Sequence, residues 1–214
     1  METTIHYVLI LDKSGSMGCL QKTVISCFNE QIDSILKMQR ENPECDVKIT
    51  FCTFNDEINI HYLTAAPNSL KRLSVKNYKP ESCTALYDAI GVTVAKIKEL
   101  MLEKDQVYLA VFTDGFENAS HKYTGHQIKA LFANLKENRW EIQFFCSNES
   151  SLHYRESFDL DIDNMCSLSL NEEGIKHMND QIMYSLKEMV STNKKTNIFL
   201  KKNIIDITKL SNYK

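Results

Sequence analysis

The sequence lacks the features that would place it in a membrane or in a secreted disulfide scaffold. Its apolar runs are all shorter than the ~20 residues that a membrane-spanning helix needs. Residues 1–4 show no basic segment followed by an apolar core, so we expect no secretory signal. None of the seven cysteines is spaced as Cys-x-x-Cys, and several lie in apolar stretches, which favours reduced core thiols over disulfides or a zinc site. We therefore expect a cytoplasmic protein.

The motifs of several enzyme classes are also missing. Neither Gly-x-x-x-x-Gly-Lys-Ser/Thr nor Gly-x-Gly-x-x-Gly occurs, so a nucleotide would find no phosphate-binding loop. The six histidines are scattered and none is placed as a general base for a serine. A net charge of -3 over 214 residues argues neither for nucleic acid nor for a membrane surface. We expect a protein that is not an enzyme.

What is present is a regular alternation of apolar patterns. Alternating or continuous apolar stretches predict strands at residues 5–11, 46–54, 58–63, 107–112 and 141–146, with a weaker strand within 158–170. Apolar residues at steps of three and four predict helices at residues 20–42, 86–103, 124–136 and 172–190. A short helix is expected around residues 70–73.

This alternation predicts an α/β fold, doubly wound, with a mostly parallel central sheet and helices on both faces. Asn55-Asp56 forms a turn between strands 46–54 and 58–63, so we expect an antiparallel hairpin whose second strand is an edge of the sheet. No internal repeat occurs. One domain is expected over residues 1–190, followed by an extension over residues 191–214.

The extension differs from the rest of the chain in charge. Six lysines and the single acid Asp206 give it a net charge of +5, which leaves -8 for the remainder. Two apolar clusters, residues 198–200 and 204–207, predict a short hairpin that docks on the domain or on a partner, because an isolated hairpin is marginal in water. The oligomeric state stays open.

Five oxygen-bearing residues lie where the expected strands end or a helix begins. They are Asp12, Ser14, Ser16, Thr84 and Asp114. In open α/β sheets, ligands lie just outside the carboxyl ends of the strands, so these oxygens can meet at one point. Carboxylate and hydroxyl oxygens are the ligands that hard cations such as Mg²⁺ take. The sequence therefore predicts a divalent-metal site at this edge.

The same five residues carry a resemblance. Asp-x-Ser-x-Ser, then a threonine, then an aspartate resembles the metal-ion-dependent adhesion site of von Willebrand factor A (VWA) domains, over about residues 4–190. The resemblance implies a Rossmann-like VWA fold that holds one Mg²⁺, or alternatively Mn²⁺ or Ca²⁺. It also implies a protein partner whose Asp or Glu binds that ion. The chain is similar in size to small stand-alone bacterial VWA proteins that act inside the cell.

Two alternative functions remain open. One is Mg-dependent phosphoryl transfer, although a haloacid-dehalogenase-type hydrolase has a second aspartate where Ser14 stands. The other is a structural subunit whose metal site only stabilises the fold. The leading hypothesis is a divalent-cation-dependent protein-binding module.

Each residue of the motif also has a simpler structural explanation. Ser14, Ser16 or Thr84 could cap the helix that follows it, and Asp114-Gly115 could form an ordinary turn. Gly15 and Gly115 are expected at positive φ. Two nearby acids, Asp88 and Glu117, are expected either to support the ligands or to be exposed.

Overall fold

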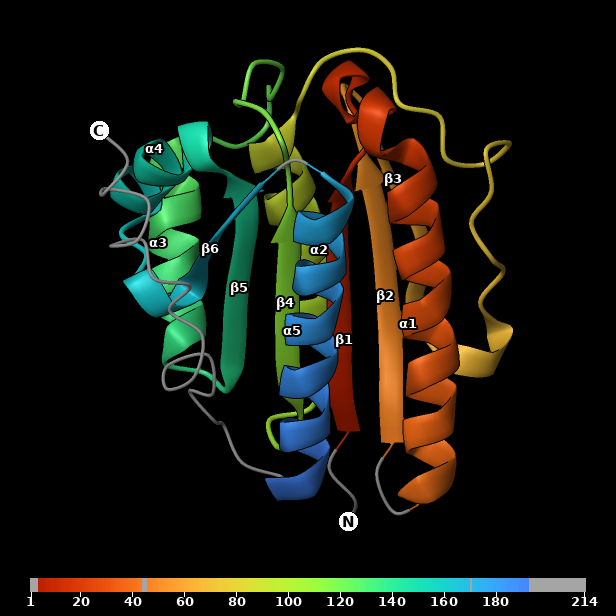
Figure 1. The fold of residues 1–214 in the computed structure, drawn as a ribbon. Helices are drawn as coiled ribbons and strands as arrows, with labels where there is room; N and C mark the ends of the chain where they lie inside the picture. Colours follow the sequence, from red (N-terminus) through yellow and green to blue (C-terminus); the bar gives the residue numbers. More distant parts are fainter. Residues whose placement is uncertain (1–3, 44–45, 170, 193–214) are drawn as a thin grey trace, which may run out of the picture.

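The computed structural model describes residues 4–43, 46–169 and 171–192, which form a central sheet with helices on both faces (Figure 1). The strands are β1 (Thr4–Asp12), β2 (Asp46–Phe54), β3 (Ile58–Ala65), β4 (Gln106–Phe112), β5 (Trp140–Ser147) and β6 (Met165–Leu168). The helices are α1 (Gln21–Glu41), α2 (Leu86–Leu100), α3 (Gly125–Lys136), α4 (Asn148–Phe158) and α5 (Glu172–Thr192). Short 3₁₀ helices are η1 (Gly15–Leu20), η2 (Pro67–Ser69) and η3 (Ile162–Asn164).

The strand order is β3-β2-β1-β4-β5-β6, and every neighbouring pair is parallel except β2 and β3. Asp12 pairs with Phe54, and Leu11 pairs with Phe112, so β1, β2 and β4 end at the same edge of the sheet. The predicted fold class is confirmed, including the antiparallel hairpin that places β3 at an edge.

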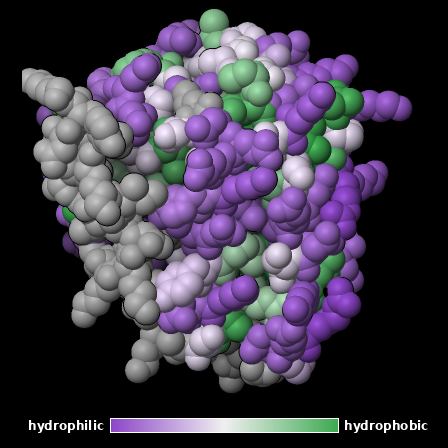
Figure 2. Space-filling model, viewed as in Figure 1, coloured by the Kyte–Doolittle hydropathy of each residue, from purple (hydrophilic) through white to green (hydrophobic). Residues whose placement is uncertain are grey.

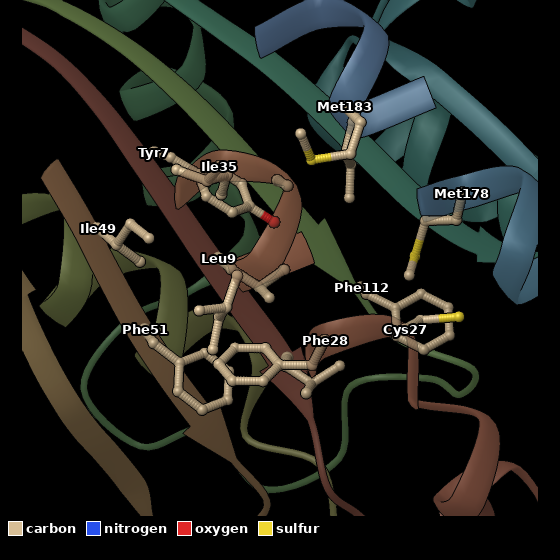
Figure 3. Packing of buried hydrophobic residues seen from close by; sticks show 14 of the residues in the cluster. Tyr7, Leu9, Cys27, Phe28, Ile35, Ile49, Phe51, Phe112, Met178 and Met183 are labelled. Atoms are coloured by element: carbon tan, nitrogen blue, oxygen red, sulfur yellow. The ribbon is translucent and has the colours of Figure 1, made fainter. Parts of the chain in front are cut away.

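Helices α1 and α5 cover one face of the sheet. Alternate residues of β1, such as Tyr7 and Leu9, point to this side, because successive side chains of a strand face opposite ways (Figure 3). Phe28 of α1 packs on Phe51 of β2 with ring centroids 4.4 Å apart. Met183 of α5 belongs to the same cluster. This apolar layer fixes both long helices against the sheet.

Helices α2, α3 and α4 cover the opposite face, where Val8 and Ile10 of β1 are fully buried. Phe144 of β5 packs there against Tyr154 and Phe158 of α4, with ring centroids 5.1 and 5.7 Å away. The central strands are therefore buried on both sides, as expected for parallel sheets.

The outer surface contrasts with these two apolar layers. The view in Figure 2 is mostly hydrophilic over α1 and α5, which agrees with the amphipathic patterns of both helices. Within the described part of the chain, no helix combines the length and the apolar character needed to cross a membrane.

The predicted short helix around residues 70–73 is wrong. The 3₁₀ helix η2 ends at Ser69, and Leu70 has extended backbone. Asn29 of α1 explains the difference, because its side chain accepts a hydrogen bond from the Leu73 amide (2.9 Å) and donates one to the Leu73 carbonyl (3.1 Å). These bonds replace the internal hydrogen bonds of a helix.

Two further differences concern helices. The sequence analysis did not predict α4, whose apolar pattern is weak because few of its residues face the core; Tyr154 and Phe158 are its large buried side chains. Helix α2 ends at Leu100, three residues before the predicted end. There the amide of Leu102 donates to the Asp105 side chain (2.9 Å). The hairpin predicted within residues 191–214 lies outside the described residues.

Candidate metal centre

The five candidate residues lie at the edge where β1 and β4 end. Asp12 is the last residue of β1. Ser14 lies in the turn just before η1, and Ser16 lies within η1. Asp114 follows β4 by two residues. Thr84 stands two residues before α2, and the carbonyl of the neighbouring Ser82 accepts a hydrogen bond from the Gly15 amide (3.1 Å). Three segments far apart in the sequence therefore meet here.

The Asp12 carboxylate is fully buried and is held on both oxygens. Its Oδ1 accepts from the Ser14 amide (2.6 Å), and its Oδ2 accepts from the Thr113 hydroxyl (2.6 Å). The Tyr78 hydroxyl donates to the Asp12 carbonyl (2.7 Å). The orientation of this carboxylate is thus fixed before any ligand arrives.

A chain of short contacts joins the serines to the second carboxylate. The Ser14 and Ser16 hydroxyls lie 3.2 Å apart, and the Ser16 hydroxyl donates to Oδ1 of Asp114 (2.6 Å). Asp12, Ser14, Ser16 and Asp114 are therefore linked directly by hydrogen bonds.

Thr84 joins this group through Gly115. A Cβ placed on Gly115 would lie 3.8 Å from the Ser16 hydroxyl and 4.0 Å from the Thr84 hydroxyl, so both oxygens border the space that the missing side chain leaves. The Asn118 side chain accepts a hydrogen bond from the Thr84 amide (2.9 Å), and the Asn118 amide donates to the Thr84 carbonyl (3.0 Å). The threonine is thereby held facing the other candidates.

The simpler explanation of the hydroxyls as helix caps does not apply to two of them. Ser14 is the N-cap of η1 but makes no side-chain capping hydrogen bond, and the N-cap of α2 is Ala85 rather than Thr84. The prediction that Gly15 and Gly115 have positive φ is wrong: none of the six glycines, all of them in the described residues, has positive φ. Gly115 instead leaves the position beside both hydroxyls without a side chain.

The electrostatics of the site favour a cation. Burial raises the pKa of Asp12 to about 6, and the neighbouring charge of Asp114 adds to the effect. Burial likewise raises the pKa of Asp114, and burial together with both carboxylates raises the pKa of Tyr78. Among the described residues, no lysine or arginine forms an ion pair with either carboxylate. A divalent ion would supply the missing positive charge.

The donor set suits a hard ion. Two carboxylates and three hydroxyls are the oxygen ligands that Mg²⁺, Mn²⁺ and Ca²⁺ prefer. Across the described ranges, no cluster of three or more His, Cys, Asp or Glu side chains forms a softer or more acidic metal site.

The acids Asp88 and Glu117 support the loop that follows β4. Asp88 is buried, and its carboxylate accepts from the amides of His121, Lys122 and Tyr123 at 2.8 to 3.0 Å. Glu117 accepts from the amides of three residues at 2.7 to 3.0 Å, which are Tyr87, Ala119 and Ser120. Both carboxylates therefore bind backbone amides of this loop and of α2, and no hydrogen bond within the described chain links them to the five candidate residues.

The sequence analysis missed four supporting residues, which are Tyr78, Thr113, Asn118 and Tyr154. The Tyr154 hydroxyl donates to the Gly115 carbonyl (2.9 Å) and accepts from the Glu117 amide (2.8 Å). Thr113 and Asn118 lie beside Asp114 in the sequence, which is a signal that they belong to the site loop. Tyr78 and Tyr154 carry no such signal, because they reach the site from distant segments.

An apolar side chain lies next to the candidate ligands. Phe116 directly follows Gly115, and its side chain is 48% exposed. Its ring contacts that of His153 on α4 edge to face, with centroids 5.4 Å apart. The loop that carries Asp114 thus also presents an aromatic side chain at the surface.

No protein-family model and no curated protein matches the sequence, but solved structures share its fold. The PilB minor pilin from Streptococcus sanguinis aligns with a TM-score of 0.62 at 11% identity, over 89% of this chain and 63% of the pilin. The SpRpn10 VWA domain aligns with a TM-score of 0.55 at 13% identity, over 84% of this chain and 95% of that domain.

A third structure bears on the site. Proximal thread matrix protein 1 from the mussel byssus, with a zinc-occupied metal-ion-dependent adhesion site, aligns with a TM-score of 0.59 at 11% identity, over 86% of this chain and 46% of the mussel protein. The chain thus spans less than two thirds of the pilin and of the mussel protein. The fold is that of VWA domains.

Proposed function

We propose that this protein is a divalent-cation-dependent protein-binding module that recognises an acidic group on a protein partner. Asp12, Ser14, Ser16, Thr84 and Asp114 would hold the ion, with Mg²⁺ as the first candidate and Mn²⁺ or Ca²⁺ as alternatives. We further propose a cytoplasmic location, where the six free cysteines of the described residues stay reduced.

The observation that carries this proposal is the pair of buried carboxylates, Asp12 and Asp114, each of which accepts a hydrogen bond from a hydroxyl on the other's segment. Burying two carboxylates close together costs free energy unless a cation accompanies them. The Ser16 hydroxyl, 2.6 Å from Asp114, satisfies one carboxylate oxygen but supplies no charge. A bound divalent ion would balance both acids.

The candidate residues would have different roles in holding the ion. Asp12, held by the Ser14 amide and the Thr113 hydroxyl, keeps a fixed orientation toward the site. Ser16 and Thr84 border the space left by Gly115. The ion, when bound, supplies an electrophilic position at which a carboxylate of the partner can bind. Because that contact is charged and partly desolvated, a partner that lacks its Asp or Glu should bind far more weakly.

Phe116 indicates what lies next to the acidic group. Its half-exposed ring, backed by His153, is suited to an apolar side chain of the partner. Replacement of Phe116 by alanine should therefore weaken partner binding and leave metal affinity unchanged. That combination separates the partner surface from the metal site.

Metal binding is tested by thermal unfolding with and without Mg²⁺ or Mn²⁺. The native chain should gain several degrees in Tm at millimolar metal, because ligand binding to the folded state stabilises it. Asp12→Ala and Asp114→Ala should abolish the gain, whereas Asp56→Ala, at an exposed turn, should keep it. An equal metal response in all four proteins would contradict the proposal.

Recognition of acids is tested with a displayed peptide library that is bound in Mg²⁺ and eluted with EDTA. The recovered peptides should share an Asp or Glu, and its replacement by Asn or Gln should reduce affinity by at least 100-fold. Recovered peptides without a common acid would refute acidic recognition. Metal-dependent hydrolysis of a generic phosphate ester, lost in Asp12→Ala, would instead support phosphoryl transfer.

A further inference from the structure

The segment that carries Thr84 has no helix or strand of its own. Residues 81–85 lie in the connection from β3 to α2, which Figure 1 shows in yellow, crossing the edge of the sheet where β1 and β2 end. Thr84 is nevertheless buried, and its hydroxyl borders Gly115 together with that of Ser16. Its position must therefore come from contacts that the segment makes with the rest of the chain.

Two backbone hydrogen bonds tie this segment to the turn that follows β1. The Glu81 amide donates to the Lys13 carbonyl (2.9 Å), and the Gly15 amide donates to the Ser82 carbonyl (3.1 Å). Ser82 has a φ of 68°, in the left-handed region that residues other than glycine rarely adopt. Such a conformation persists only where surrounding contacts hold it. The backbone just before Thr84 is therefore fixed by its neighbours in space.

Asn55, the first residue after β2, binds the segment on both sides of Thr84. Its side-chain Nδ2 donates to the Glu81 carbonyl (3.2 Å), and its backbone carbonyl accepts from the Ala85 amide (2.7 Å). Its side-chain oxygen accepts from the Glu57 amide (3.0 Å), and the residue is buried. One asparagine thus closes the turn between β2 and β3 and also holds the segment that carries Thr84.

The amide side chain is what allows Asn55 to make both contacts. An amide donates and accepts at once, whereas an aspartate would face the Glu81 carbonyl with no proton to donate. A serine could still accept from the Glu57 amide, because its hydroxyl forms the same kind of turn. Its side chain is one bond shorter and would not reach the Glu81 carbonyl. The two contacts can therefore be separated by substitution.

We propose that Asn55 is a positioning residue of the metal centre, which fixes the Thr84 hydroxyl toward the ion by binding the residues on either side. This inference rests on the proposed function, since it concerns the affinity of the same site for a divalent ion. Asn55 is none of the five candidate ligands and acts on one of them through the backbone. Residues that orient metal ligands typically contribute about 10- to 100-fold to metal affinity.

Titration of the full chain with Mn²⁺ measures this contribution. Asn55→Ser should weaken Mn²⁺ binding about 10-fold, because the contact to Glu81 is lost while that to Glu57 is kept. The matched control is Asn77→Ser. The Asn77 side chain also closes a turn, by accepting from the Ser74 amide (2.7 Å), but its hydrogen bonds within the described chain do not reach residues 81–85. Mn²⁺ affinity should be unchanged in that variant.

A double-mutant cycle separates positioning of Thr84 from a general loss of structure. In a Thr84→Ala background, Asn55→Ser should change Mn²⁺ affinity by less than about twofold, because the hydroxyl that Asn55 positions is absent. In a Ser14→Ala background, the full effect of Asn55→Ser should persist. An equal effect in both backgrounds, or no effect in the native background, would overturn this inference and leave the metal site itself standing. A native chain that does not bind Mn²⁺ would refute the proposed function and this inference with it.

A second measurement needs no metal. Hydrogen exchange of the Gly15 and Ala85 amides, which bind the segment or belong to it, should accelerate about 10-fold in Asn55→Ser. The Tyr123 amide, held by Asp88 (2.8 Å), should exchange as in the native chain and so report an intact domain. Unchanged exchange at Gly15 and Ala85 would overturn the proposal. Equal acceleration at Tyr123 would overturn it too, because the substitution would then loosen the whole domain.

Discussion

At the scale of single residues, Gly115 is the residue that lies beside the hydroxyls of Ser16 and Thr84 in the candidate metal site. Its backbone lies in a φ region open to any residue, so conformation does not explain why glycine stands there. The hydroxyls of Ser16 and Thr84 lie 3.8 and 4.0 Å from a Cβ built at this position, so a methyl group here would contact two of the proposed ligands. The hydroxyls of Ser16 and Thr84, rather than the backbone conformation, therefore account for a glycine at this position.

Gly115→Ala should therefore abolish metal binding and leave the fold intact, because the new contacts are of ordinary van der Waals length. The matched control is Gly18→Ala, where an added Cβ meets nothing within 4 Å. Isothermal titration with Mg²⁺ or Mn²⁺ measures the first effect and thermal unfolding the second. Normal metal affinity in Gly115→Ala would show that the ion does not lie between these hydroxyls.

At the scale of elements, the loop between β4 and α3 depends on its contacts with α2. Asp88 of α2 binds the amides of residues 121–123, and the Tyr123 ring then packs on Gly91, one turn further along α2. A Cβ on Gly91 would lie 2.5 Å from the ring atoms of Tyr123, which is closer than any real contact. The glycine lets the ring lie flat on the helix.

Gly91→Ala should lower the free energy of unfolding by about 1–3 kcal/mol, the usual cost of overpacking. Tyr123→Ala combined with Gly91→Ala should recover part of this loss, since it removes the clash. Denaturant unfolding of the two single variants and the double variant gives the coupling directly. Strict additivity of the three values would mean that the ring and the helix do not constrain each other.

At the scale of the whole molecule, the buried carboxylates couple metal binding to the pH dependence of folding. The pKa of Asp12 rises from its ordinary value of 3.8 to about 6 in the folded chain. Without metal, the folded state binds this proton more tightly than the unfolded state. The resulting stability is full below pH 4 and is lost as the pH rises through 6.

The metal-free protein should therefore lose on the order of 3 kcal/mol of stability between pH 4 and pH 7 from this group, at about 1.4 kcal/mol per pKa unit. A divalent ion competes with the proton, so the stabilisation by Mg²⁺ should be small at pH 5 and large at pH 7.5. Denaturant unfolding across this range checks both trends. Asp12→Asn should flatten the metal-free trend, and an unchanged slope in that variant would assign the effect to other groups.

The sequence by itself determined the fold class, the strand and helix pattern and the five candidate residues. The spacing of apolar residues is a local feature that can be read directly from the sequence. For this reason β1, β4 and α5 were predicted within a few residues of their observed ends. The candidate residues could be found because each stands where a pattern stops. Their role as metal ligands stays a prediction, although the structure brings their side chains together.

Only the tertiary structure decided the features that rest on contacts between distant segments. Asn29 holds the backbone at Leu73 in place of the predicted helix, and the Tyr78 and Tyr154 hydroxyls fix the loops around the site. Gly115 was explained by its neighbours in space and not by its φ. A hydrogen bond from a side chain to a remote backbone group leaves no periodic trace in the sequence, so such features appear only when the chain is folded.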